Sequence, residues 1–343
     1  MGLRAFMIRR LLLFIPTLIG VTLLIFAVLQ VFTPIQRAAL YVTSPREARD
    51  LGKIIEKYHL NDPLHIQYYH WMTAVLHGNL GWSEITHQPV LASMIQAAPA
   101  TIELVIFVIP LTILLGIYLG VKSAVHRDSA IDHITRITSI IGWSLPTFWF
   151  AIILIAVFYG GLGWFGIGRL GNEAYQLVIS DQFVRYTGLN TVDGLLNGQL
   201  WVTLDALEHL VLPVTALVVV QIALIIRVMR SSMLEELSKG YVVTARAKGL
   251  AKNVVVNKHA RRNALIPTVT VSGILAAGLL TGVVITETVF DYKGLGYFAA
   301  HGAMQLDIPA VLGFALFAGL MFCAANLIVD VVYGYLDPRI RLG

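Results

Sequence analysis

Charged side chains are scarce in this chain. Asp, Glu, Lys and Arg make up only 13% of its 343 residues, whereas 57% are hydrophobic, and the mean hydropathy is +0.74. A soluble domain carries about 25% charged residues. The composition therefore excludes an ordinary soluble protein and indicates a chain that lies mostly in lipid.

Cysteine is nearly absent as well. Cys323 is the single one, and it lies within an apolar run. An intramolecular disulfide is therefore excluded, and we interpret Cys323 as a packing residue without a redox role.

The motifs of common catalytic and nucleotide sites are also missing. The phosphate-loop pattern G-x-x-x-x-G-K-[ST] does not occur, and the ten histidines show no H-E-x-x-H or paired metal spacing. Gly161–Gly166 matches G-x-G-x-x-G, but it follows an apolar run instead of joining a strand to a helix. We therefore expect no catalytic residue, no metal site and no cofactor bound by this chain.

Long apolar runs are abundant. A helix needs about 20 apolar residues to cross a bilayer, and lipid-embedded backbone must bond within its own element. The runs predict an all-α polytopic membrane protein with six transmembrane helices, at Leu11–Val31, Leu104–Val121, Ile137–Tyr159, Leu210–Ile226, Ile266–Thr286 and Val311–Val329. The first run is too long for the core of a typical signal peptide, so we expect a retained span.

The distribution of Lys and Arg predicts the orientation. Seventeen lie in the tails and in the 122–136 and 227–265 loops, whereas eight lie in the longer segments on the other side. The positive-inside rule therefore places both termini and the 227–265 loop in the cytoplasm. The same asymmetry explains the basic pI, so no nucleic acid partner is expected.

Carboxylates lie at the ends of the predicted spans and not at their centres. For Glu103, Glu287 and Asp330 we favour a structural ion pair or a location at the membrane interface. A proton-driven secondary carrier needs mid-span carboxylates, so this alternative is weakened but stays open. A membrane assembly scaffold is a third hypothesis.

Small and hydroxyl side chains are concentrated in the fifth predicted span. Gly278–Gly282 forms a G-x-x-x-G pattern, as does Gly116–Gly120 in the second span. Small residues let helix backbones approach closely, and hydroxyls can line a wet path. Close packing and a polar wall of a translocation path both remain open. The candidates for the path are Thr270, Gly273, Ala277 and Thr281.

Two external segments are expected to fold. Arg46–Tyr58 is predicted to be a polar helix that Ser44 or a neighbour caps, and the 160–209 region is predicted to be a structured excursion. These segments are either a docking surface for an extracytoplasmic partner or a structural cap.

The basic 227–265 loop predicts a short helix at Tyr241–Lys248. Val242, Ala245 and Leu250 form its apolar side, and Gly249 is placed to act as a left-handed carboxyl cap. A second stretch, Asn253–Ala264, is expected to lie along the membrane surface before Pro267 opens the fifth span. The loop either docks into a groove of another protein or holds the topology against anionic lipid.

Two segments of this loop carry a family resemblance. Tyr241-x-x-Thr-Ala-Arg-Ala-Lys-Gly249 and His259-Ala-x-Arg-Asn-Ala-Leu-Ile-Pro267 resemble the coupling loop of ATP-binding-cassette importer permeases of the dipeptide/oligopeptide permease family. Further resembling segments lie, in order, at Arg9–Leu13, Gly78–Gly81, Ala100–Leu104, Ser144–Trp149, His209–Pro213, Arg230–Glu235, Glu287–Gly296 and Leu336–Arg341. The chain departs from the broader superfamily at Val243-Thr244-Ala245, where Glu-Ala-Ala is usual, and this form is common in the peptide branch.

The resemblance implies a type I importer transmembrane domain in the cell membrane. It implies a second homologous permease subunit, two cytosolic ATP-binding subunits that use ATP and Mg²⁺, and an extracytoplasmic solute-binding protein. The ATPase-coupling residues it implies are Tyr241, Thr244, Ala245, Arg246, Ala247, Lys248 and Gly249. The expected cargo is peptide, with oligosaccharide as the alternative and nickel less favoured. We divide the chain into residues 1–99, the first span with its external loop, and residues 100–343, a five-helix core that contains the coupling loop.

Overall fold

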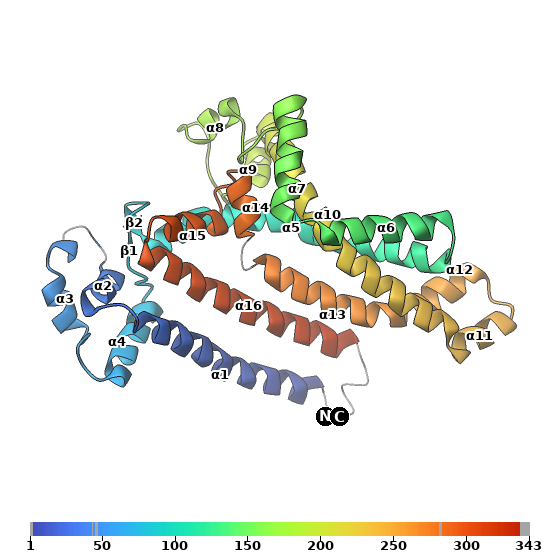
Figure 1. Cartoon of the computed structure of the whole chain (residues 1–343), viewed down its shortest axis with the longest axis horizontal. Coiled ribbons are helices and arrows are strands. Elements are labelled where there is room, and N and C mark those ends of the chain that lie inside the picture. The colour runs from blue at the N-terminus through green and yellow to red at the C-terminus, as the bar shows by residue number, and fades with distance from the viewer. Residues whose placement is uncertain (1–2, 43, 45–46, 281–282, 337–343) are drawn as a thin grey trace.

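The apolar runs form long helices in the computed structural model, which describes residues 3–42, 44, 47–280 and 283–336. Five helices are long and apolar enough to cross a membrane, and a sixth span results if the bent pair α6–α7 counts as one. This confirms the predicted all-α, six-span fold. The helices in question, arranged as in Figure 1, are α1 (Leu3–Leu29), α5 (Val90–Val125), α6 (Ala130–Ser144) with α7 (Thr147–Leu154), α10 (Leu200–Ser238), α13 (Arg261–Leu280) and α16 (Ile308–Leu336).

The third predicted span is broken. α6 and α7 meet at an angle of 102°, and α7 stands away from the other long helices in Figure 1. Pro146 causes the break, because proline disfavours helical backbone at the residue before it, and Leu145 is extended at φ −81°, ψ 125°. The prediction of one continuous helix over Ile137–Tyr159 is therefore wrong. A π-helix, η3 (Ile155–Gly161), continues α7.

The fifth span begins earlier than predicted. α12 (Lys252–Val254), the π-helix η4 (Val255–Ala260) and α13 form one continuous helical stretch, and Pro267 lies inside it. The prediction that Pro267 opens the span is therefore wrong. Val255, Val256 and Ala260 are buried against α10 and α11, so one face of this stretch packs on protein. Its other face is exposed, and the expected location along the membrane surface stays a prediction.

The core forms where α5 and α10 lie against each other. A Cβ placed on Gly116 would lie 2.6 Å from Ile225 Cγ2, and one on Gly120 would lie 2.7 Å from Met229 Cβ. The glycines therefore let the two helices approach closely, as small residues do in membrane interiors. For the G-x-x-x-G pattern of α5, the close-packing interpretation is confirmed.

A small folded unit, predicted to be external, follows α1. It packs around buried Phe26, Tyr41 and Trp71 and is built from short elements. The predicted helix Arg46–Tyr58 is wrong in its extent, because the helix begins only after Asp50, whose side chain accepts a hydrogen bond from Lys53 N. The elements are α2 (Pro34–Ala38), η1 (Ala39–Tyr41), η2 (Glu47–Arg49), α3 (Leu51–Lys57), α4 (Leu64–Leu76) and the hairpin β1 (Trp82–Ser83) with β2 (Gln88–Pro89).

The 160–209 segment, also predicted to be external, is folded as expected. It contains α8 (Asn172–Val178) and α9 (Asn190–Leu196). In Figure 1 it lies beside α14 (Val284–Val289), which α15 (Leu295–Met304) follows in the chain. Buried Glu103 attaches it to α5, since its carboxylate pairs with Arg169 at 2.7 Å and accepts a hydrogen bond from Thr191 N at 2.8 Å. The ion-pair interpretation of Glu103 is confirmed.

Glu287 differs from the expectation. It is fully buried, and it accepts hydrogen bonds from Thr101 Oγ1 at 2.7 Å and Tyr297 N at 2.9 Å. It therefore forms no ion pair among the residues the structure describes, and its location at the depth of the membrane interface stays a prediction. The side chain of Asp330 lies outside the described residues.

Helix α5 runs across residue 99, where we divided the chain into two parts. That division remains a prediction.

The close contact of α5 with α10 predicts the effect of Gly120→Ala. The added methyl group would overlap Met229 and approach the carbonyl oxygen of Ile226, so the helices must separate. We expect a loss of about 1–3 kcal/mol in the free energy of unfolding. Thermal unfolding of the detergent-solubilised protein measures it. Gly20→Ala is the control, because a Cβ at Gly20 has no atom within 4 Å. Equal melting temperatures for the two variants would contradict the packing role of Gly120.

Candidate functional site

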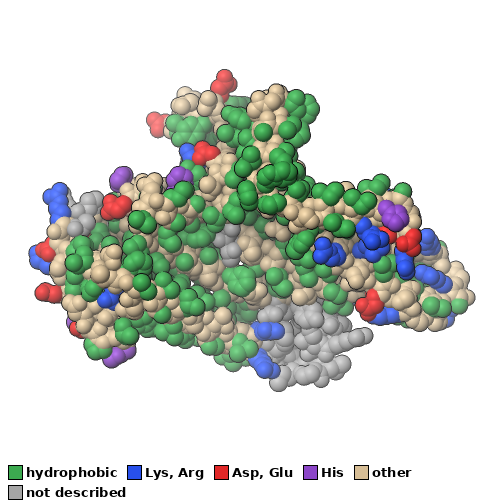
Figure 2. Space-filling model, viewed as in Figure 1, with side chains coloured by type: hydrophobic (Ala, Val, Ile, Leu, Met, Phe, Trp, Pro, Cys, Tyr) green, Lys and Arg blue, Asp and Glu red, His purple; other side chains and the backbone are tan. Residues whose placement is uncertain are grey.

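The predicted cytoplasmic helix is present as α11 (Gly240–Ala247). It follows the end of α10, where Lys239 is extended and turns the chain back, and it lies at one end of the molecule in Figure 1. Figure 2 shows that Lys and Arg side chains gather over this end, where α6, α10, α11 and α12 meet. The element is therefore short, basic and positioned beyond the long helices.

One side of α11 is buried. Val242 and Ala245 are spaced by three residues, so they share one face of the helix, and they pack with Met229 and Met233 of α10. Two of the three predicted apolar positions are therefore confirmed. Leu250 is 41% exposed, so its assignment to the apolar side is wrong, because the helix ends before it and the chain turns away.

The other side of α11 faces outward. Thr244, Arg246, Ala247 and Lys248 are exposed, whereas Ala245 from the same predicted set points inward. Thr244 Oγ1 donates a hydrogen bond to Gly240 O at 2.9 Å. In the described part of the chain, the guanidinium of Arg246 has neither an ion pair nor a hydrogen bond. This cation is therefore available to a partner.

Tyr241 attaches α11 to two long helices. Its hydroxyl donates a hydrogen bond to Glu236 Oε2 on α10 at 2.5 Å and accepts one from Asn263 Nδ2 on α13 at 3.0 Å. Lys239 Nζ pairs with the other oxygen of Glu236 at 2.6 Å. Burial, together with the hydrogen bond to Glu236, raises the pKa of Tyr241. The hydroxyl therefore stays protonated and can donate at neutral pH.

Gly249 ends α11 as predicted. Its φ is +79°, in the left-handed region that glycine adopts without steric cost. Gly249 N–H donates to Arg246 O at 2.9 Å, and Leu250 N–H donates to Ala245 O at 3.3 Å. These two bonds form a Schellman motif. The carboxyl end of α11, beside Arg246, is therefore fixed in one geometry.

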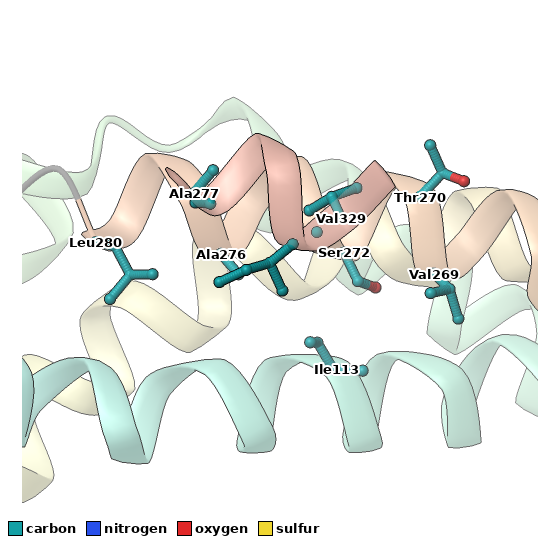
Figure 3. Close-up of a pocket in the computed structure, with 11 residues that line it drawn as sticks. Ile113, Val269, Thr270, Ser272, Ala276, Ala277, Leu280 and Val329 are labelled. Atoms are coloured by element: carbon teal, nitrogen blue, oxygen red, sulfur yellow. The ribbon is translucent and has the colours of Figure 1, made fainter. Parts of the chain in front are cut away.

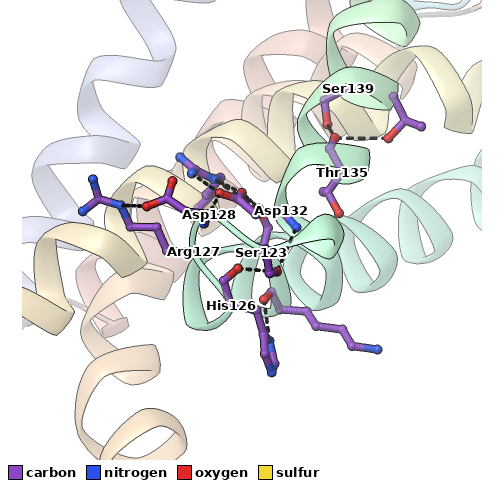
Figure 4. Close-up of polar contacts among 11 residues, drawn as sticks. Ser123, His126, Arg127, Asp128, Asp132, Thr135 and Ser139 are labelled. Atoms are coloured by element: carbon purple, nitrogen blue, oxygen red, sulfur yellow. Dashed lines mark hydrogen bonds and ion pairs between the residues drawn. The ribbon is translucent and has the colours of Figure 1, made fainter.

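A second polar cluster lies at the same end and was not predicted. Arg230 of α10 makes two hydrogen bonds of 2.7 Å to the carboxylate of Asp132 on α6. Ser123 of α5 donates to Asp132 Oδ1 at 2.5 Å, and Figure 4 shows Ser123 and Asp132 pointing toward each other. The cluster therefore joins α5, α6 and α10. Sequence reasoning missed it because Asp132 and Arg230 are 98 residues apart.

The path candidates line a cavity of about 250 Å³ between α5, α13 and α16. Thr270, Gly273 and Ala277 all contribute to its wall, whereas Thr281 lies outside the described residues. Figure 3 shows Ile113 of α5 pointing toward α13, from which Val269 and Ser272 extend. Ser272 Oγ is buried without a hydrogen-bond partner in the described chain. The wall thus combines small residues with larger apolar side chains such as Ile113, Leu280 and Ile328.

The sequence matches known protein families over nearly its whole length. Residues 112–342 match the family described as binding-protein-dependent transport system inner membrane component, and residues 3–116 match the family of its N-terminal part. The chain is 36% identical to the dipeptide transport system permease protein DppB of Alkalihalophilus pseudofirmus, over 98% of this chain and 99% of that protein.

Two further relatives come from other bacteria. The probable D,D-dipeptide transport system permease protein DdpB of Escherichia coli is 41% identical, over 83% of this chain and 82% of that protein. The oligopeptide transport system permease protein AppB of Bacillus subtilis is 34% identical, over 98% and 99%.

The cap geometry predicts that Gly249→Ala loosens the end of α11. A Cβ at this position meets no atom within 4 Å, so the cost is conformational, about 1–2 kcal/mol for a left-handed residue other than glycine. We expect the amides of residues 249 and 250 to exchange about five- to thirtyfold faster. Hydrogen–deuterium exchange measures this change. Gly240→Ala is the control, since its Cβ also meets no atom but its φ is not positive. Equal exchange in both variants would reject the cap.

Proposed function

This chain belongs to the family of binding-protein-dependent transport system inner membrane components, and from that premise we propose that it forms half of the translocation path of an ATP-driven peptide importer. It is a membrane-embedded permease subunit of the inner membrane. The observation that carries the proposal is α11, a capped helix anchored on one side and exposed on the other, with the unpaired Arg246 beside its end. Such a helix suits docking into a groove of another protein.

The partners follow from this role. A second homologous permease subunit would supply the other half of the path, and an extracytoplasmic binding protein would deliver the solute. Two cytosolic ATPase subunits would bind the coupling helices and carry out ATP hydrolysis with Mg²⁺, so this chain needs no catalytic residue or cofactor. In this arrangement both termini and α11 lie in the cytoplasm, in accord with the Lys and Arg asymmetry.

The proposed cargo is di- or oligopeptide. It is supported by relatives whose names state dipeptide, D,D-dipeptide or oligopeptide transport, at 34–41% identity. None of these names refers to an oligosaccharide or to nickel. The binding protein is expected to select the peptide, because it is the component that meets the solute first.

The contacts of α11 suggest how movement is transmitted. Tyr241 bonds α11 to α10 through Glu236 and to α13 through Asn263, so a displacement of α11 moves both helices. α10 is in close contact with α5 at Gly116 and Gly120. ATP-driven closure of the ATPases would therefore shift a packed group of helices between two discrete arrangements.

The cavity between α5, α13 and α16 is the proposed stretch of the path. Thr270, Ser272, Gly273 and Ala277 line it, and the absence of bulky side chains at these positions leaves room for a peptide. Thr281 lies outside the described residues and stays in the proposal as a path candidate.

Arg246→Glu tests the coupling role. Charge reversal at the ATPase contact should reduce peptide-stimulated ATP hydrolysis of the reconstituted transporter at least tenfold, about 1.4 kcal/mol, because a like charge then faces the acidic groove residue that we expect. Subunit assembly, measured by co-purification, should persist. Arg127→Glu is the control, since Arg127 is exposed in the α5–α6 turn at the same end of the molecule.

Two outcomes would contradict the proposal. Unchanged stimulation in the Arg246→Glu transporter would remove α11 as the contact element. Uptake by the isolated chain in liposomes, driven by an ion gradient without ATP, would replace the importer with the secondary-carrier hypothesis.

Ala276→Leu tests the path. Ala276 lines the cavity and is partly exposed, so the larger side chain should fill space that the peptide needs. We expect uptake of a labelled dipeptide to fall several-fold while the melting temperature changes little. Ala318→Leu on α16 is the control, because Ala318 does not line this cavity. Equal uptake by both variants would place the path elsewhere.

A further inference from the structure

A second cavity, of about 350 Å³, lies between α6 and α10 at the end of the molecule that carries α11. The polar part of its wall is basic: Arg136 and Ser139 come from α6, and Arg227, Arg230 and Ser231 come from α10. Ile140, Ile226 and Leu234 form the apolar part. Residues spaced by three or four lie on one helix face, so each helix presents a basic and hydroxyl-bearing stripe to the same hollow. Neither the coupling element nor the proposed path uses these side chains as a binding surface.

The charges of this cavity are not balanced. Asp132 neutralises Arg230 through two hydrogen bonds of 2.7 Å. Arg136 and Arg227 have no carboxylate partner in the part of the chain that the structure describes, and both are exposed. A hollow of this size with two uncompensated guanidinium groups favours an anion, and guanidinium binds phosphate oxygens in pairs.

The surroundings place this anion site at a membrane surface. The guanidinium of Arg227 lies 5.4 Å from the ring centroid of Trp143, and tryptophan is enriched where hydrocarbon meets headgroups. Ile137, Ile140 and Ile141 on α6 are each more than half exposed and lie within the predicted third span. The cavity thus has cations on its polar side and apolar side chains suited to acyl chains beside them.

We propose that this cavity binds the phosphate headgroup of an anionic phospholipid, such as phosphatidylglycerol. Arg136 and Arg227 bind the phosphate oxygens. The hydroxyls of Ser139 and Ser231 line the same cavity. Arg230 stays bound to Asp132 and forms the rigid floor. The lipid would therefore rest against α10, the helix that also holds α11, at the end where basic pockets between helices bind acidic lipids.

The test measures lipid retention and does not depend on transport. The purified transporter is incubated in detergent with phosphatidylglycerol, phosphatidylcholine or inorganic phosphate, and bound species are quantified by native mass spectrometry. We expect retention of phosphatidylglycerol over phosphatidylcholine. In the double variant Arg136→Gln/Arg227→Gln, apparent affinity for phosphatidylglycerol should fall about twenty- to thirtyfold, which corresponds to about 1 kcal/mol for each basic residue.

Two further variants keep the test decisive. Arg136→Lys/Arg227→Lys should recover much of the affinity, which separates lost charge from misfolding. Lys122→Gln/Arg127→Gln removes the same charge from the neighbouring α5–α6 turn, outside the cavity, and should retain the lipid.

Three results would overturn the proposal. These are equal retention of both lipids, equal loss in the Lys122/Arg127 control, and binding of inorganic phosphate without a lipid preference. A fourth result would also overturn it: cross-linking of the Arg136→Cys variant to a partner subunit in preference to a lipid would assign the cavity to a protein interface. Because retention is measured without ATP or peptide, failure here leaves the importer proposal intact, and failure of the importer proposal leaves this one intact.

Discussion

The close contact between α5 and α10 is the interaction on which the rest of this structure depends. Without a Cβ at Gly116 and Gly120, the backbones approach until Ile225 and Met229 fill the space. In lipid there is little hydrophobic driving force between helices, so such close contact supplies much of the association energy. Met229 also packs against the base of α11, which makes the same contact part of the coupling element.

Buried charges attach the remaining elements to this pair of helices at both ends. At the end away from α11, Glu103 of α5 binds Arg169 and holds the folded 160–209 segment. Toward the opposite end, Arg230 of α10 binds Asp132 and holds α6. Breaking a buried ion pair by removing one partner typically costs about 3–5 kcal/mol, because the remaining charge stays in low dielectric. The two pairs therefore hold the 160–209 segment against α5 and α6 against α10.

Prolines show how far sequence reasoning reaches. Pro146 and Pro267 both lie at or near a predicted span, yet Pro146 breaks its helix and Pro267 is contained within one. The difference lies in the surroundings: Thr268 is fully buried beside Met229, and the π-helical turns of η4 precede Pro267. Local propensity disfavours both prolines equally, so only the packing of neighbouring helices separates the two cases.

The sequence by itself determined the membrane class, the approximate positions of the spans, the amphipathic side of α11 and its cap at Gly249. These features depend on the length of apolar runs, on helical periodicity and on the conformational freedom of glycine, which are all local properties. Only the tertiary structure decided that Tyr241 bonds Glu236 and Asn263, that Asp132 meets Arg230, and that Arg136 and Arg227 line one cavity. Such contacts join residues far apart in the chain, and no local pattern specifies which distant helices will pack together.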